Sequence, residues 1–277
     1  MPSMLTPRQI SERRRAFRQL HESGCFVIPN PWDSGSARYL EHLGFKALAT
    51  TSSGAAWSRG EADGQMQLEA VLEHLREMVQ ATPLPINADF EAGFAADAAG
   101  VARNVRKALD TGVAGLSIED STGNPDQPLR DITEAVERIR SARAAIDEAG
   151  GEALLVGRAE NFFAGKPDLD DAIRRLKAYS EAGADCLYAP GLRTAEDVAA
   201  AVKAVAPLPL NVLMWTKGLS VAELADLGVR RISVGGALAR AAWAGFLGAA
   251  REIAAEGRFD RLGEAATGAE LKALLKP

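Results

Sequence analysis

The sequence predicts an α/β protein of the (β/α)8 barrel class, and three observations support that fold. Short apolar segments alternate with helical segments about eight times along the chain, which is the pattern of a (β/α)8 barrel. The 277 residues suit a single barrel domain over 1–277, and the 47% hydrophobic composition can fill a large core. No Gly-x-Gly-x-x-Gly fingerprint follows the first expected strand, which disfavours the competing fold, a doubly wound open sheet.

Eight apolar segments bounded by Gly, Pro or polar turn residues predict the strands. The third of them, Ile86–Phe90, follows Pro83 and Pro85 and precedes Gly93. Small residues follow the second strand, at 52–56, and are expected to form a loop. In order, the expected strands are 25–29, 45–51, 86–90, 114–118, 153–157, 184–188, 208–214 and 229–234.

Capping residues mark where the expected helices begin. Thr6 is a suitable N-cap with Pro7 at the first helical position, and Asp131, Thr194 and Ser220 serve later helices in the same way. In order, the expected helices are 6–22, 35–43, 67–82, 98–111, 132–149, 169–182, 195–206, 221–227 and 237–256, with a short helical piece at 269–275.

Glycine recurs where a helix gives way to the next strand. Gly44, Gly112, Gly183 and Gly228 each follow a helical segment and precede an apolar one by one or two residues. A helix commonly ends on a left-handed residue that only glycine adopts at little cost. These four glycines therefore predict tight turns from helix to strand.

The bulk composition excludes several classes of protein. The net charge of −5 argues against a nucleic-acid partner, and no apolar run approaches the ~20 residues that span a membrane. Cys25 and Cys186 have no metal-ligand spacing and indicate reduced core cysteines of a cytoplasmic protein. The first eight residues lack the basic-then-apolar pattern of a signal peptide, so none is expected. The basic cluster 13–15 is expected to be a solvated helix face. The chain has only three histidines, which makes a histidine-based metal site or a Ser-His-Asp triad unexpected. Any chemistry is therefore left to carboxylates, arginine and neutral polar groups.

Acidic residues close two successive strands. Asp89 and Glu91 are two residues apart and would share a face, and Glu119 and Asp120 end the next strand. Surface carboxylates at a strand end are the simpler interpretation of either pair alone. Parallel strands, however, bring their carboxyl ends to one edge of a barrel, where such barrels keep their chemistry. Carboxylates gathered there would repel one another, so a bound cation is the favoured explanation.

Other polar residues fall at the same end of the expected strands. Each of them alone is more often a hydrogen-bonded core group than a functional one, and only their convergence favours a site. They are Ser53, Gly54 and Ala55 after the second strand, Asp63 in the loop beyond, Arg158 and Asn161 after the fifth, Tyr188 on the sixth, Asn211 on the seventh and Ser233 on the eighth.

Five segments of the sequence resemble the isocitrate lyase/phosphoenolpyruvate mutase superfamily, and the resemblance runs from 30 to 236. They are Thr51-Ser-Ser-Gly-Ala, Ala62-Asp-Gly, Ala88-Asp-Phe-Glu-Ala-Gly93, Ile118-Glu-Asp-Ser121 and Gly157-Arg-Ala-Glu-Asn161. The resemblance implies a barrel whose last helix is exchanged between the subunits of a dimer or tetramer. It also implies Mg²⁺, or Mn²⁺ in its place, and a small-molecule carboxylate substrate, a 2-oxo or 2-hydroxy acid cleaved by way of an enolate.

The resemblance also implies roles for individual residues. Asp89 would be the direct Mg²⁺ ligand, while Asp63, Glu91 and Glu119 would hold metal-bound waters. Ser53, Gly54 and Ala55 would bind the substrate carboxylate, with Tyr188, Asn211 and Ser233 lining the substrate site. Arg158 would neutralise the developing oxyanion, and Glu119 and Asn124 join it as the expected catalytic residues.

The loop after the fourth strand departs from the lyases of this superfamily. They carry a Lys-Lys/Arg-Cys-Gly-His loop there, whereas Ser121–Arg130 contains no Cys, His or Lys. The prediction is therefore a Mg²⁺-dependent carbon–carbon lyase similar to oxaloacetate decarboxylase rather than an isocitrate or methylisocitrate lyase. The alternatives are a P–C bond mutase or hydrolase, for which Asn124 is present but the expected Lys is absent, and a carboxylate-binding barrel without catalysis.

The segment Ala237–Glu256 predicts how the chain associates. Its large apolar residues Trp243, Phe246 and Leu247 share one helical face, and its many alanines leave little polar surface. One interpretation is a buried helix that packs on its own barrel. The other, favoured by the resemblance, is a helix that packs on a neighbouring subunit of a homo-oligomer.

Overall fold

The computed structural model describes residues 5–275, and its centre is one sheet of eight parallel strands. The strand order β1-β8-β7-β6-β5-β4-β3-β2 runs around a barrel. The backbone N–H of Ala49 donates to Pro29 O at 3.1 Å and so links the sheet's two outer strands. The predicted (β/α)8 barrel is confirmed. Its strands are β1 Phe26–Ile28, β2 Leu48–Ala49, β3 Ile86–Asp89, β4 Gly115–Glu119, β5 Leu154–Arg158, β6 Cys186–Tyr188, β7 Leu210–Leu213 and β8 Arg231–Ser233.

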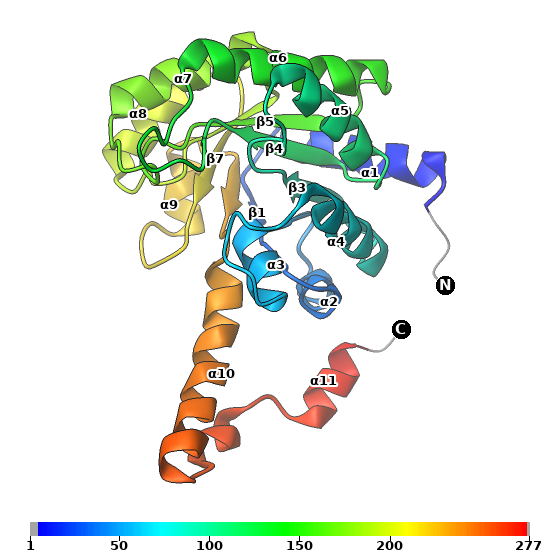
Figure 1. Cartoon of the computed structure of the whole chain (residues 1–277), viewed down its shortest axis with the longest axis vertical. Coiled ribbons are helices and arrows are strands. Elements are labelled where there is room, and N and C mark those ends of the chain that lie inside the picture. Colours follow the sequence, from blue (N-terminus) through cyan, green and yellow to red (C-terminus); the bar gives the residue numbers. More distant parts are fainter. Residues whose placement is uncertain (1–4, 276–277) are drawn as a thin grey trace.

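Helices surround the barrel and connect its strands (Figure 1). The turns behave as their glycines predict, because Gly44, Gly112, Gly183 and Gly228 all have φ between 85° and 101°. No described helix is long and apolar enough to span a membrane. The helices are α1 Pro7–Leu20, α2 Ser34–His42, α3 Ser52–Ser58, α4 Leu68–Ala81, α5 Ala98–Leu109, α6 Ile132–Glu148, α7 Leu169–Glu181, α8 Ala195–Val205, α9 Val221–Asp226, α10 Ala237–Glu256 and α11 Gly268–Leu274, with a 3₁₀ turn at Asp260–Glu264.

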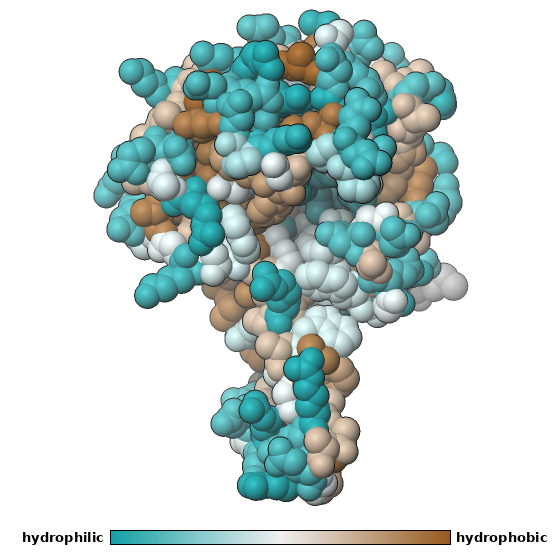
Figure 2. Space-filling view, turned by 60° about the vertical axis from the view of Figure 1, so that its left-hand side comes forward, coloured by the Kyte–Doolittle hydropathy of each residue, from teal (hydrophilic) through white to brown (hydrophobic). Residues whose placement is uncertain are grey.

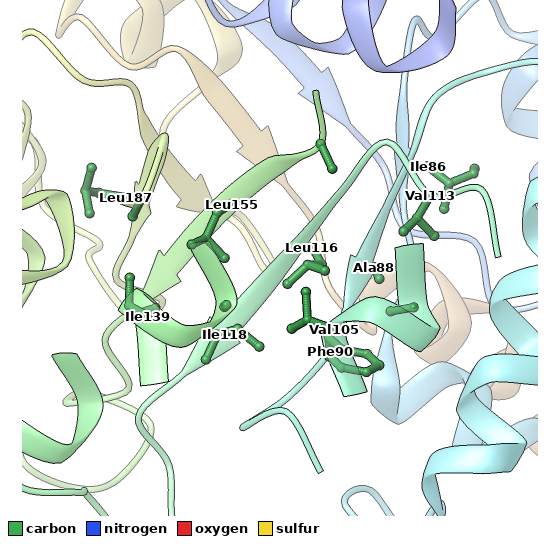
Figure 3. Packing of buried hydrophobic residues seen from close by; sticks show 14 of the residues in the cluster. Ile86, Ala88, Phe90, Val105, Val113, Leu116, Ile118, Ile139, Leu155 and Leu187 are labelled. Carbon is green, nitrogen blue, oxygen red and sulfur yellow. The ribbon is translucent and has the colours of Figure 1, made fainter. Parts of the chain in front are cut away.

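The core has two layers, because successive side chains of a strand point to opposite faces of the sheet. Outward-facing residues of β3, β4 and β5 form one apolar cluster under the surrounding helices. Figure 3 shows Leu116 of β4 near Val105 of α5, and Ile86 of β3 beside Val113. A second cluster fills the barrel interior, where Phe17 of α1 is fully buried beside Leu154 and Cys186. Helix α1 thus supplies part of the core at the amino-terminal end of the barrel.

Two expectations about local structure are wrong. Residues 52–58 form helix α3 rather than a loop, because Thr51 caps it by accepting a hydrogen bond from the N–H of Gly54. The basic cluster 13–15 is not a solvated face. Arg14 is 8% exposed and donates hydrogen bonds to the carbonyls of Leu109 and Val113. These hydrogen bonds hold α1 against the carboxyl end of α5.

Beyond its amino-terminal end, helix α10 does not pack on its own barrel. It stands clear of the barrel in Figure 1, and Ala239 is its one buried residue. Hydrophobic and hydrophilic atoms lie side by side along it in Figure 2. Exposed apolar side chains occur along its length, namely Leu238, Trp243, Phe246, Leu247 and Ile253. The interpretation of this segment as a buried helix of the same barrel is therefore wrong.

Candidate active site

A cavity of about 380 Å³ opens at the carboxyl end of the barrel strands. Asp89 and Arg158, the last residues of β3 and β5, line it together with Tyr188 and Ser233 at the ends of β6 and β8. Ser53 and Asp63 reach it from the segment after β2. Six of the residues expected from the sequence therefore meet in one cavity, as the parallel arrangement of the strands requires.

Arg158 joins the acids of three neighbouring strands. Its Nη1 lies 3.1 Å from Asp89 Oδ1 and 3.0 Å from Glu119 Oε2, and its Nε donates to Glu160. Asp89 is fixed further by the backbone N–H of Ser52, which donates to Oδ2 at 3.0 Å. A single guanidinium thus orients the carboxylates, because its rigid fork of donors matches several oxygens at once.

The carboxylates outnumber the cations at this point of the barrel. The pKa of Glu91 is raised to about 7. Burial is the largest cause, and the negative charges of Asp89 and Asp63 raise it further. Burial also raises the pKa of Glu119 and of Glu160, against the opposing charge of Arg158. Glu91 has a φ of 44°, a left-handed conformation that is uncommon outside glycine and is enriched at functional sites. With all of these carboxylates ionised, the site would hold more negative charge than Arg158 neutralises, which, together with burial, is why their pKa values are raised.

The donor set fits a hard divalent cation. Carboxylate oxygens are the protein ligands of Mg²⁺, which usually takes one or two of them and keeps several waters. Each Asp89 oxygen accepts one hydrogen bond and retains acceptor capacity. Within residues 5–275, no three His, Cys, Asp or Glu side chains are grouped closely enough to enclose a metal by themselves. Asp89, with Asp63, Glu91 and Glu119 around it, is where a cation would offset the excess charge.

Gly54 and Ala55 do not line the cavity. Within α3 their N–H groups already donate to Thr51, to its Oγ1 at 3.3 Å and its carbonyl at 3.0 Å. Gly54 has a packing role, since an added Cβ would lie 2.9 Å from Trp32 Cβ. Of the three expected carboxylate-binding residues only Ser53 faces the cavity, with its hydroxyl 3.1 Å from that of Thr51.

The remaining expected residues divide between the cavity wall and the exterior. Tyr188 lies under Arg158, whose Cζ is 5.2 Å from the centre of the Tyr188 ring. Asn211 is fully buried behind the wall and donates to Ser233 Oγ at 2.9 Å. Asn124 is exposed in the loop after β4, outside the cavity, and its side-chain carbonyl accepts from the N–H of Asp126. Asn124 therefore stabilises a turn in this structure.

Several cavity residues were not anticipated from the sequence. Arg231 and Asn87 line its floor, and Trp215 and Arg240 its rim. Strand alternation would have placed Arg231 on the same face as Ser233, which is the signal that could have identified it. A larger depression, of about 960 Å³, lies outside the barrel mouth between residues 126–129 and the start of α7. It lacks the Asp89–Arg158 cluster, so the chemistry favours the barrel cavity.

Comparisons with known proteins show which enzymes this chain is similar to. A family model described as phosphoenolpyruvate phosphomutase matches residues 17–254. The chain is similar to oxaloacetate decarboxylase of Bradyrhizobium sp. (strain ORS 278), with 32% identity over 225 residues, 78% of this chain and 74% of that protein. It is 33% identical to 2-methylisocitrate lyase of Escherichia coli (strain K12) over 183 residues, 63% of this chain and 60% of that protein. A solved structure of a candidate lyase/mutase from Burkholderia cenocepacia J2315 superposes with a TM-score of 0.92 at 46% identity, covering 96% of both chains.

Proposed function

Because the chain belongs to the phosphoenolpyruvate phosphomutase family and is an enzyme of the isocitrate lyase/phosphoenolpyruvate mutase superfamily, we propose that it cleaves a carbon–carbon bond of a small 2-oxo dicarboxylic acid. The reaction is a decarboxylation of the oxaloacetate type. The observation that carries the proposal is the Arg158 guanidinium held between Asp89 and Glu119 at the cavity mouth. This arrangement suits charge that develops on a substrate oxygen as a bond breaks.

The electron pair of the broken bond defines what the residues must do. As the bond to the departing carboxylate breaks, CO₂ leaves and the electron pair forms an enolate across C3, C2 and the 2-oxo oxygen. Arg158 is the donor that we assign to that oxygen, and such a donor is typically worth about 3 kcal/mol of transition-state stabilisation. A divalent cation at Asp89, Mg²⁺ or Mn²⁺, would supply further Lewis-acid stabilisation when bound. Protonation at C3 then gives pyruvate.

The neutral donors in the wall complete the binding site. Burial raises the pKa of Tyr188 to about 12, so its phenol keeps its proton at neutral pH and can donate to a substrate oxygen. Ser53 offers a hydroxyl on the opposite side, and the Asn211–Ser233 hydrogen bond orients the Ser233 hydroxyl. These groups bind and orient the substrate without adding to the negative charge.

The loop after β4 argues for decarboxylation over the isocitrate lyase reaction. Within Ser121–Arg130 the hydroxyl of Thr122 donates to Gln127 O, and the N–H of Thr122 donates to Pro128 O at 3.0 Å. The loop is held by its own hydrogen bonds and contains no Cys, His or Lys to transfer a proton. The family model's description keeps a P–C bond mutase or hydrolase as the second candidate.

A panel of substrates tests the proposed function. With Mg²⁺, the protein is expected to release pyruvate from oxaloacetate or a related 2-oxo acid faster than a metal-only blank. It should release no glyoxylate or succinate from isocitrate or 2-methylisocitrate at ordinary lyase rates, since general acid–base catalysis is worth about 10²–10⁴-fold. Conversion of phosphonopyruvate alone would establish the second candidate. Rapid cleavage of 2-methylisocitrate would refute the proposal.

We also propose that a second copy of the chain covers α10. A groove of about 540 Å³ runs between α10 and the end of α3, lined by Trp57, Trp243 and Leu247 among others. The adjoining Phe246 side chain is 60% exposed, an unusual position for a large apolar residue unless another surface covers it. The same helix in a neighbouring subunit offers the complementary apolar surface.

Light scattering at micromolar concentration is expected to give at least twice the chain mass of 29.3 kDa. Phe246→Glu should shift the protein toward the monomer, because a buried unpaired carboxylate is costly. Leu43→Glu, at a residue 55% exposed on the barrel, is the matched control and should leave the mass unchanged. A wild-type mass near that of one chain would exclude the oligomer.

A further inference from the structure

The cavity continues below the carboxylate cluster into the barrel interior. Side chains two residues apart on one strand point to the same side, about 7 Å apart along it. Asn87 and Arg231 therefore lie one level below Asp89 on β3 and Ser233 on β8, and all four line the cavity. The small side chain of Ala49 lines the cavity at this depth as well, so the cavity extends to the level of Arg231.

Arg231 has unusually few partners for a buried arginine. It is 3% exposed, and its one hydrogen bond, from Nη1 to Asn87 Oδ1, is 3.5 Å long. Its Nε is buried without a partner, and below it lies the ring of Phe17, 5.8 Å from Cζ. The titratable groups that act on it are the Cys186 thiol, the Tyr188 hydroxyl and the His21 imidazole, and all three are neutral at physiological pH. Among the described residues, no carboxylate forms an ion pair with it.

Other buried arginines of this chain are satisfied differently. Arg14 donates to two carbonyls at 3.0 and 3.1 Å, and Arg138 donates to three carbonyls and to Glu134. Arg175 is paired with Asp120 and Asp171. A buried charge without such partners is costly, and an arriving anion would offset that cost. Arg231 is thus a cation at the floor of a cavity with donor capacity left for a ligand.

We infer that Arg231 binds the substrate carboxylate next to the 2-oxo group, the one that is retained in the product. This inference rests on the proposed function and names a binding residue that the superfamily resemblance does not supply. Two further observations favour this carboxylate. The Gly54 and Ala55 N–H groups expected to bind it are already used within α3. A departing carboxylate, moreover, loses its charge in the transition state, so an ion pair with it would stabilise the ground state and slow the reaction.

The test compares a charged ligand with its neutral analogue and needs no turnover. Wild-type protein is expected to bind pyruvate about 10- to 100-fold more tightly than pyruvamide, the range for a hydrogen bond to a charged group. Arg231→Met should abolish that preference, and Arg231→Lys should retain part of it because the charge remains without the planar fork. Calorimetric titration gives the affinities, and thermal unfolding shows which variants are folded.

Arg14→Met is the matched control, since it removes a buried arginine that does not line the cavity, and it should keep the wild-type preference. A purely structural role for Arg231 would leave the preference for pyruvate unchanged in Arg231→Met or, if that variant does not fold, in Arg231→Lys. Either result overturns the inference, as does a wild-type protein that binds pyruvate and pyruvamide equally or binds neither. Because binding is read directly, a substrate panel that yields no pyruvate would refute the proposed function and leave this test valid.

Discussion

Asp89→Asn is expected to abolish divalent-metal binding and to lower kcat about a thousandfold, while the barrel still folds. The asparagine has nearly the same shape and can still accept from the Ser52 N–H, but it lacks the charge that would hold the cation. Loss of metal-assisted and oxyanion stabilisation together accounts for an effect of this size. Titration calorimetry with Mg²⁺ and Mn²⁺ measures the first effect and steady-state kinetics the second.

Asp126→Asn is the matched control for this experiment. Asp126 is an exposed acid of the loop after β4 and does not line the barrel cavity, so the substitution removes one charge without touching the cluster. It should leave both metal affinity and kcat near their wild-type values. An unchanged metal affinity in Asp89→Asn would show that the cation binds elsewhere or not at all.

Arg158→Met is expected to lower kcat about 10²- to 10³-fold and also to destabilise the protein. The guanidinium is the oxyanion donor in the proposed reaction and the shared partner of Asp89, Glu119 and Glu160. Removing one member of a buried ion-paired group leaves uncompensated charge, a loss of about 3–5 kcal/mol. Denaturant unfolding measures the second effect, and added Mg²⁺ should recover part of the stability by binding to the freed carboxylates.

Arg158→Lys separates charge from geometry in the same site. The lysine keeps one positive charge among the acids, so most of the stability should return, but it lacks the fork that reaches several oxygens together. Its kcat should stay well below wild type. A wild-type kcat in Arg158→Met would remove Arg158 from the mechanism.

The position of α10 bears on the active site as well as on assembly. Arg240 and Ala237 of this helix line the barrel cavity, and Gly236 before it lies against Ser53, where an added Cβ would come within 2.5 Å of the hydroxyl. The amino-terminal end of α10 therefore forms part of the wall of the candidate substrate site. A substitution at the exposed Phe246, further along the helix, tests assembly without altering the cavity wall.

Much of the fold could be predicted from the sequence because its causes are local. The signals that predicted eight strand–helix units each act over only a few residues. They are the alternating apolar segments, N-caps such as Thr6 and Ser220, and left-handed glycines such as Gly44. Acids at the ends of consecutive strands predicted the cluster for a topological reason. Once the strands are parallel, Asp89, Glu119 and Arg158 must meet at one edge whatever the intervening loops do.

Other features depended on which groups meet in space, and only the tertiary structure decided them. Residues 52–58 look like a loop until Thr51 caps them as a helix, which commits the N–H groups expected to bind substrate. Arg230 and Arg231 are neighbours in the sequence and chemically identical. The pairing of β8 with β1 and β7 turns Arg231 into the barrel, while Arg230 donates outside it to Gly24 O. Strand alternation puts Arg231 on the same face as Ser233. Only the folded barrel shows that this face is the interior and that the Arg231 guanidinium is buried there.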